Sequence, residues 1–123
     1  MISIDSYGWI ERFTSGPKSS RYNRIIDRCN AAEIITSVVV LYEVYKRVKR
    51  MKGEEMALEA VAALSQTRVI SLDQTLVLEA ADYSLEEGLH FADALVYATA
   101  RHYGTELHTS DEHLKGLKDV VFV

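Results

Sequence analysis

The sequence alternates between short apolar runs and longer segments with helical periodicity, and this alternation limits the possible folds most strongly. Between the apolar runs, hydrophobic residues recur at the three- and four-residue spacing of amphipathic helices. Strands that alternate with helices form a mostly parallel sheet with helices on both faces. We therefore predict an α/β fold, a three-layer α/β/α sandwich with a central sheet of about five strands. The predicted strands are "ISID", "EIIT", "RVISL", "TELHT" and "VVFV".

Local signals give the boundaries of the helices between these strands. Thr36 or Ser37 can cap one helix, and Asp73 can cap another, because their side-chain oxygens accept bonds from free backbone N–H groups. Gly53 and Gly104 are placed to end helices. The predicted helices cover residues 6–13, 18–30, 37–52, 54–65, 73–87 and 91–103.

The length of 123 residues predicts a single domain over residues 1–123. The loop at residues 14–20 is too short to separate two domains. No apolar run approaches the roughly 20 residues of a membrane helix, and the first residues lack a signal-peptide pattern. Cys29 is the only cysteine, which excludes an intrachain disulfide and a cysteine zinc cluster. We therefore expect a cytoplasmic protein with no membrane association.

The formal net charge of -4 argues against a protein that coats nucleic acid without specificity. It does not exclude a nuclease, because carboxylates that bind metal ions add negative charge that the metal neutralises. Positive charges also gather in one predicted helix, where they could hold an RNA backbone. A solvated helix face explains this cluster equally well. The cluster comprises Lys46, Arg47, Lys49, Arg50 and Lys52.

Four acidic residues stand apart from the others by position. Asp5 ends the first strand, Asp111 directly follows the fourth, and Asp93 begins a helix. Each has a structural alternative, because Asp5 and Asp111 could cap turns and Asp93 could favour the positive end of its helix. Glu43 is hardest to explain structurally, since it lies in the apolar segment "VVVLYEVY". An unpaired buried carboxylate costs several kcal/mol or shifts its pKa.

The expected topology brings these four carboxylates together. The carboxyl ends of parallel strands share one edge of the sheet, where such folds bind ligands. Carboxylates that converge repel one another, so a divalent cation is the natural occupant of such a cluster. Oxygen ligands favour Mg²⁺ or Mn²⁺, and a shared carboxylate could bridge two ions about 4 Å apart.

The residues around these acids resemble the PIN-domain family, and in particular VapC-type toxins of toxin–antitoxin systems. The matching stretches are "ISIDSYGWIERF", "TSVVVLYEVYKRVKR", "FADALVYATARHYG" and "LHTSDEHLKGLKDVVFV". They occur in order and at family-like spacing over nearly the whole chain. The resemblance implies a single PIN-like domain.

The resemblance also implies an activity and its residues. It implies a Mg²⁺- or Mn²⁺-dependent endoribonuclease whose catalytic and metal-binding residues are Asp5, Glu43, Asp93 and Asp111. Small hydroxyl residues that orient the carboxylates or water would be Ser6, Thr109 and Ser110. The expected partners are an RNA substrate, a VapB-type antitoxin bound at the active-site groove, and a second copy of the chain in a homodimer.

Other polar and aromatic residues have open interpretations. Glu112 could be an auxiliary ligand, although a loop charge explains it better. The histidines His90, His102, His108 and His113 lack zinc-like spacing, and His90 and His113 could have a minor substrate role. The apolar residues of the first and third predicted helices could belong to the core or to a partner interface. They are Tyr7, Trp9, Ile10, Phe13, Tyr42 and Tyr45.

Two rival functions fit parts of the sequence. The first is a catalytically silent PIN-like module that binds RNA or protein, which the intact set of four acids disfavours. The second is a phosphotransfer enzyme or receiver that uses Asp5 as its phosphoacceptor. A haloacid-dehalogenase-type enzyme needs a second Asp two residues later, where this chain has Tyr7. A receiver would use the end of its third strand, and Asp73 gives that alternative weak support.

Overall fold

The computed structural model describes residues 1–123 and contains one five-stranded sheet in the order β3-β2-β1-β4-β5. All neighbouring strands are parallel, so the predicted α/β class is confirmed. The strands are β1 (Ile2–Ile4), β2 (Ile34–Ser37), β3 (Arg68–Ile70), β4 (Glu106–Thr109) and β5 (Val120–Phe122). The helices are α1 (Ser6–Thr14), α2 (Ser19–Asp27), the 3₁₀ turn η1 (Ala31–Glu33), α3 (Val38–Lys52), α4 (Glu54–Ser65), α5 (Gln74–Glu87) and α6 (Phe91–His102).

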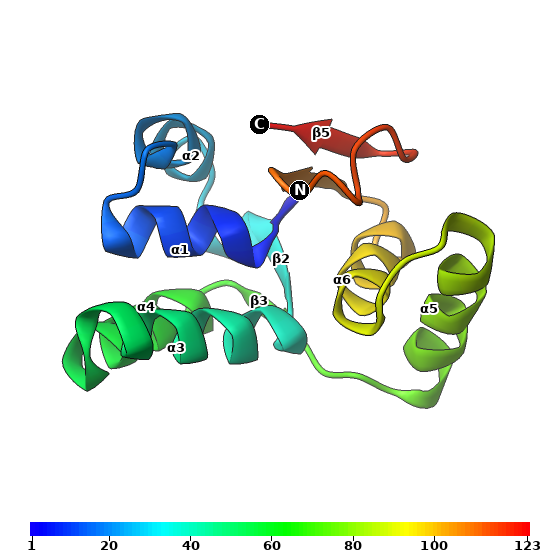
Figure 1. Cartoon of the computed structure of the whole chain (residues 1–123), viewed down its shortest axis with the longest axis horizontal. Coiled ribbons are helices and arrows are strands. Elements are labelled where there is room, and N and C mark those ends of the chain that lie inside the picture. Colours follow the sequence, from blue (N-terminus) through cyan, green and yellow to red (C-terminus); the bar gives the residue numbers. More distant parts are fainter.

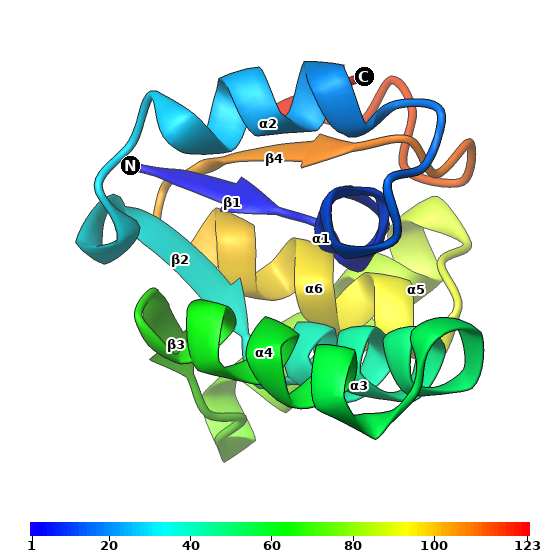
Figure 2. The same cartoon turned by 90° about the vertical axis from the view of Figure 1, so that its left-hand side faces the viewer.

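The helices form the two outer layers of the predicted sandwich. Helices α1 to α4 lie on one side of the sheet, and α5 and α6 lie on the other (Figure 1). Because the strands are parallel, every strand that leads into a helix ends at the same edge of the sheet. That edge lies where α1 and α3 begin (Figure 2). None of the helices has the length and apolar character that crossing a membrane requires.

Several elements are shorter than the sequence pattern predicts. Strand β1 ends at Ile4 because Asp5 already caps α1, with its side chain accepting a bond from the Ser6 N–H. The helix expected to continue to Asn30 ends at Asp27. Asn30 instead starts the 3₁₀ turn, where its backbone N–H donates to Glu33. Short polar side chains therefore set these boundaries by bonding to the backbone.

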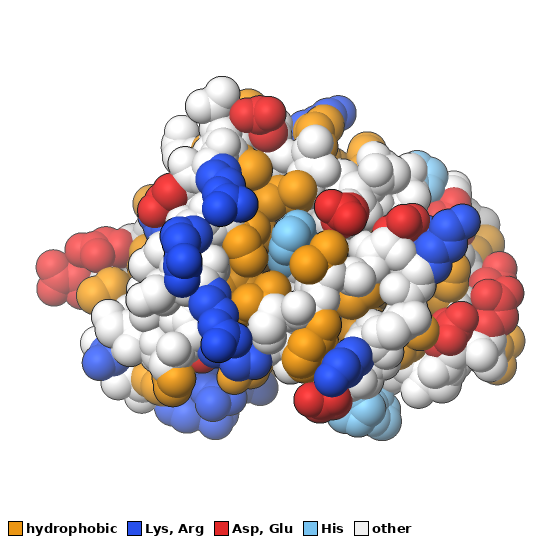
Figure 3. Space-filling view, turned by 90° about the horizontal axis from the view of Figure 1, so that it is seen from above, with side chains coloured by type: hydrophobic (Ala, Val, Ile, Leu, Met, Phe, Trp, Pro, Cys, Tyr) orange, Lys and Arg blue, Asp and Glu red, His pale blue; other side chains and the backbone are white.

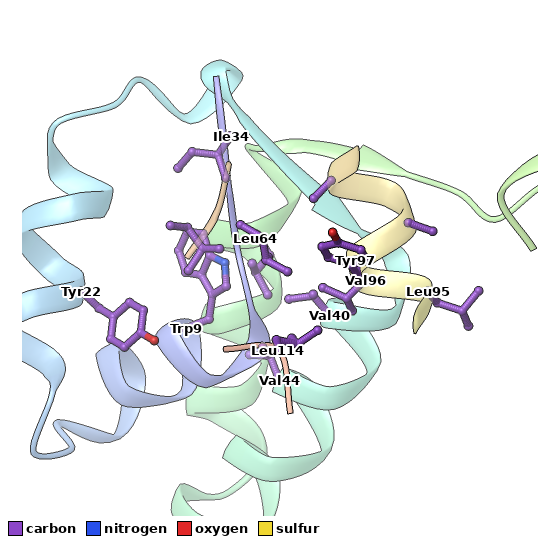
Figure 4. Close-up of a cluster of buried hydrophobic side chains, with 14 of the residues drawn as sticks. Trp9, Tyr22, Ile34, Val40, Val44, Leu64, Leu95, Val96, Tyr97 and Leu114 are labelled. Atoms are coloured by element: carbon purple, nitrogen blue, oxygen red, sulfur yellow. The ribbon is translucent and has the colours of Figure 1, made fainter. Parts of the chain in front are cut away.

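The core lies on both faces of the sheet and is built mainly from aliphatic side chains (Figure 4). One stripe of α3, formed by Val40, Val44 and Val48, is buried as its spacing predicts. Met51 continues the stripe in sequence, yet half of its surface is exposed. It lines a shallow groove at the surface beside Ile10.

Helices α1 and α2 pack unusually closely through a glycine. A Cβ atom added to Gly8 would lie 2.5 Å from the ring of Tyr22 and 2.7 Å from Ile4. The absence of a side chain at Gly8 therefore lets the buried Tyr22 ring lie directly on α1. This contact holds α2 over the carboxyl end of β1.

Candidate active site

A cleft of about 630 Å³ opens at the carboxyl edge of the sheet. Its walls come from the end of β1, the first turns of α1, the outer face of α3, the start of α6 and the loop after β4. All four acids predicted from the sequence line it. The lining residues are Asp5, Ser6, Tyr7, Ile10, Tyr42, Glu43, Lys46, Arg47, Arg50, Asp93, Ser110, Asp111, Glu112 and His113.

Asp5 is the most buried of the four acids, with 5% of its surface exposed. Its Oδ1 accepts a bond from the Ser6 backbone N–H at 2.8 Å, and its Oδ2 accepts one from the Thr109 hydroxyl at 2.7 Å. Burial raises the pKa of Asp5, while these two donors oppose the rise. The sequence left open whether Asp5 caps a helix or belongs to a site, and in the structure its carboxylate caps α1 and also lines the cleft.

Glu43 and Asp93 titrate far above their ordinary range. Burial, followed by the charge of Asp5, raises the pKa of Glu43 to about 7. Burial, followed by the charges of Asp111 and Asp5, raises the pKa of Asp93 to about 6. Glu43 and Asp93 therefore lie in the field of neighbouring carboxylates, and all four acids line one cleft.

The structure adds an imidazole to this group. Asp93, Asp111 and His113 each offer a ligand atom, and these atoms lie within 4.8 Å of one another. The His113 ring Nδ1 lies 3.0 Å from Asp111 Oδ1, which also accepts the backbone N–H of His113 at 2.9 Å. The sequence analysis gave His113 only a minor role. Its position two residues after Asp111 is the signal that could have indicated more.

The donor set fits a divalent cation. Carboxylate oxygens are the ligands that Mg²⁺ and Mn²⁺ prefer. Burial and the neighbouring carboxylates raise the pKa of Glu43 and Asp93, and a bound cation would oppose that rise. Asp93 and Asp111, with His113 beside them, offer the most compact ligand group. Asp5 and Glu43 close the cluster from the side of the sheet and α3.

The three predicted hydroxyl residues differ in what they contact. Thr109 donates to Asp5, as expected, and its Oγ also accepts the Asp111 backbone N–H at 3.0 Å. Burial raises the pKa of both Asp5 and Glu43, and hydrogen bonding by the Ser6 side chain opposes that rise. Ser110 lines the cleft, but its hydroxyl lies 2.6 Å from the Tyr22 hydroxyl and donates to the Val123 carbonyl at 3.1 Å.

The predicted cations of α3 divide into two groups. Lys46, Arg47 and Arg50 line the cleft, as a contact with a bound polyanion requires. Lys49 does not line the cleft. Its Nζ instead donates to the Tyr45 hydroxyl at 3.1 Å and lies 3.6 Å from Glu54 Oε1.

The structure also separates the aromatic residues whose place the sequence left open. Trp9 is buried in the core. Tyr7 and Tyr42 are exposed and line the cleft, together with the partly buried Ile10. The lining of the cleft therefore combines apolar and aromatic side chains with the acidic ones.

Comparison with known structures shows the same fold in proteins of low sequence identity. A toxin–antitoxin complex from Klebsiella pneumoniae matches with a TM-score of 0.81 and 21% identity, covering 98% of this chain and 96% of that one. VapC20 of Mycobacterium tuberculosis, a toxin that cleaves the sarcin–ricin loop, matches with a TM-score of 0.79 and 22% identity, covering 98% of both chains. VapBC2 of Rickettsia felis, bound to promoter DNA, matches with a TM-score of 0.76 and 18% identity, covering 100% of this chain and 98% of that one.

No curated protein matches the chain in sequence. The profile of the PIN domain, however, matches residues 2–120. This match covers nearly the whole chain and includes all four carboxylates of the cleft. The chain belongs to the PIN-domain family.

Proposed function

We propose that the chain is a Mg²⁺- or Mn²⁺-dependent endoribonuclease and the toxin of a VapBC-type toxin–antitoxin module. The observation that supports this most directly is the convergence of Asp5, Glu43, Asp93 and Asp111 in one cleft whose rim carries cations. A cluster of like charges at the carboxyl edge of a parallel sheet is unfavourable without a bound cation.

The residues of the cleft would have different roles in RNA hydrolysis. The four carboxylates would hold one or two cations, with Asp93 and Asp111 as the most compact pair. A bound divalent cation supplies charge neutralisation at the phosphoryl oxygens and lowers the pKa of water. Thr109 holds the Asp5 carboxylate in place through its 2.7 Å hydrogen bond. Lys46, Arg47 and Arg50 would position the RNA phosphates.

The proposed partners follow from the family and its structural neighbours. Complexes of toxin with antitoxin are among the similar structures, so we propose that a VapB-type antitoxin occupies the cleft and blocks it. The exposed Tyr7 and Tyr42 in the cleft wall suit such a protein contact. An enzyme of this kind would meet its RNA in the cytoplasm and act as a homodimer.

A cleavage assay tests the proposal. RNA incubated with the chain should be cut in the presence of Mg²⁺ or Mn²⁺ and remain intact in EDTA. Asp5→Asn and Asp93→Asn should each abolish cleavage while keeping the circular dichroism spectrum of the folded protein. Full activity in either variant would contradict the site assignment.

The catalytically silent module predicts a different result. A silent module would bind RNA or a partner protein but leave RNA intact with every metal ion. The charge shared among the four acids favours the enzyme, because a binding module gains nothing from carboxylates whose pKa values reach about 6 and about 7.

A further inference from the structure

Helix α2 carries a row of arginines that the proposed active site does not use. Arg21, Arg24 and Arg28 are all exposed, and their spacing of three and four residues puts them on one face of the helix. We call these three residues the arginine ridge. In the space-filling view, a column of Lys and Arg side chains runs beside a hydrophobic strip on this side of the molecule (Figure 3).

No acidic side chain neutralises the arginine ridge. The ion pairs of the structure are Arg12–Asp27, Lys49–Glu54, Arg101–Asp119, His102–Glu79 and His113–Asp111. Asp27 is the one acid on α2, and it is bound by Arg12 at 2.9 Å. Like charges at three- and four-residue spacing destabilise a helix, so a face with a purely structural role gains nothing from this row. An external polyanion would compensate for it.

The helix that carries the ridge begins beside the cleft. Lys18, directly before α2, places its Nζ 5.6 Å from the ring centroid of Tyr7, and Tyr7 lines the cleft. From there α2 runs along the sheet away from the carboxyl edge (Figure 2). The ten steps from Lys18 to Arg28 rise about 15 Å along the helix, at roughly 1.5 Å per residue. A strand that leaves the cleft past Tyr7 could therefore follow the ridge over several phosphates.

Arginine is well suited to such a contact. Its planar guanidinium binds phosphate oxygens through paired N–H donors and keeps its charge at every physiological pH. The chain as a whole has a formal charge of -4, so the ridge is a local exception and not part of a generally basic surface. A repeated row of single cations matches the repeated single charges of a nucleic acid strand.

We propose that the arginine ridge is a second RNA-binding surface that holds the single-stranded flank of a substrate whose scissile bond lies in the cleft. This inference rests on the proposed ribonuclease function, since that function makes RNA the occupant of the cleft. It adds a requirement on substrate length. An RNA long enough to reach α2 binds more tightly than one confined to the cleft.

The test compares short and long RNA on a chain that cannot cut them. In an Asp5→Asn background, fluorescence anisotropy would measure the binding of labelled oligouridines of four and fourteen nucleotides. Arg21→Gln with Arg28→Gln removes two ridge charges. Arg68→Gln with Lys118→Gln removes the same charge from exposed positions elsewhere. Circular dichroism of both variants verifies that the chain remains folded.

We expect the ridge variant to bind the long RNA roughly tenfold more weakly and to bind the short RNA unchanged. For the long RNA, the slope of log K against log salt concentration should become shallower by about 1.4. Each phosphate contact with a single strand contributes about 0.7 to this slope, and the variant lacks two such contacts. The control variant should bind both RNAs like its parent.

Three outcomes would overturn the inference. Equal weakening for both lengths, or equal weakening in the control variant, would show a general charge effect and not a contact. If the ridge variant bound the long RNA as its parent does, the ridge would not be an RNA-binding surface, and an acidic protein surface would be the alternative partner. A separate outcome concerns the proposed function alone: failure of the unmodified chain to cleave any RNA, with length-dependent binding retained, would contradict that function and still support the ridge.

Discussion

At the scale of single residues, Asp5 shows how one carboxylate serves both the fold and the site. Its Oδ1 caps α1, and its Oδ2 accepts the Thr109 hydroxyl. Its backbone N–H donates to the His108 carbonyl at 3.0 Å, which continues the bonding between β1 and β4 up to the cleft. The position of this carboxylate is therefore set by three separate contacts before any ligand binds.

The first prediction concerns the Thr109 hydroxyl. Thr109→Val keeps the side-chain shape but leaves Oδ2 of the buried Asp5 carboxylate without its donor, so the pKa of Asp5 should rise further. We expect a loss of about 1–3 kcal/mol in the free energy of unfolding and weaker binding of Mn²⁺. Chemical denaturation and calorimetric titration with Mn²⁺ measure the two effects.

Ser110→Ala is the matched control for this prediction. The Ser110 hydroxyl contacts Tyr22 and the Val123 carbonyl and not a carboxylate. Its loss should leave Mn²⁺ affinity unchanged even if stability falls slightly. Equal Mn²⁺ affinity in Thr109→Val and the parent would contradict the role given to Thr109.

The second prediction follows from the raised pKa values of Glu43, about 7, and Asp93, about 6. Their ordinary values are 4.5 and 3.8. Between about pH 4 and pH 7, the folded chain therefore binds more protons than the unfolded chain, so its stability decreases as pH rises. In EDTA, the melting temperature should fall between pH 5 and pH 8. A divalent cation should raise it more at pH 8 than at pH 5.

Two variants separate this effect from the other titrating groups. Asp93→Asn should flatten the pH dependence in EDTA, because the amide side chain has no proton to release on unfolding. Asp82→Asn changes an exposed acid on α5 and should keep the parent's profile. A melting temperature that rises steadily from pH 5 to pH 8 in the metal-free parent would refute the prediction.

At the scale of elements, the contact between α1 and α2 depends on one missing side chain. Gly8→Ala would bring a methyl group to 2.5 Å from the Tyr22 ring, so either α2 or the ring must move. We expect a loss of about 1–3 kcal/mol in the free energy of unfolding. The displaced Tyr22 should also lose its hydrogen bond with Ser110.

Thermal denaturation and near-ultraviolet circular dichroism measure the effect of Gly8→Ala, since the latter reports the packing of Tyr22. Adding Tyr22→Leu to Gly8→Ala should recover part of the stability, because the smaller side chain leaves room for the methyl group. A Gly8→Ala protein as stable as the parent would show that α2 is free to move.

The elements also show what the sequence could predict and what it could not. Helical periodicity and strand length predicted every major helix and all five strands, because these patterns reflect burial on one face of each element. Asp5 and Asp111 could be placed at strand ends from the order of the elements alone. Element boundaries were less accurate, since single side-chain contacts such as the bond between Asn30 and Glu33 decide them.

The sequence did not predict the direction in which individual side chains point. The position of Lys49 among the basic residues of α3 gave no sign that it contacts Tyr45 and Glu54 outside the cleft. His113 enters the acidic group because the turn after β4 brings its ring back to Asp111. Such facts depend on rotamers and loop geometry, which a pattern of residue types does not contain.

At the scale of the whole molecule, one apolar surface outside the cleft remains open to solvent. A hollow of about 450 Å³ between α5 and α6 is lined almost entirely by hydrophobic side chains. Two of them, Leu85 and Phe91, are 86% and 78% exposed. Exposed large apolar side chains in a contiguous group are typical of protein interfaces, and this surface is the best candidate for the proposed homodimer.

The corresponding prediction is that Leu85→Glu with Phe91→Glu converts a dimer into a monomer, because the charges would be buried without partners in the interface. Size-exclusion chromatography with light scattering measures the mass. Leu58→Glu, at an exposed apolar position of α4, is the control and should remain dimeric. A dimer that survives the double substitution would place the interface elsewhere.

The sheet order has a consequence for the synthesis of the chain on the ribosome. Strand β4 occupies a place between β1 and β5, although it is the fourth strand to be made. Asp111 follows it, and Thr109, the donor to Asp5, is part of it. The first carboxylate emerges more than a hundred residues before its partner. A nascent chain can therefore form β1, β2 and β3 with their helices before the acidic cluster is complete. The cluster is assembled only when β4 inserts beside β1.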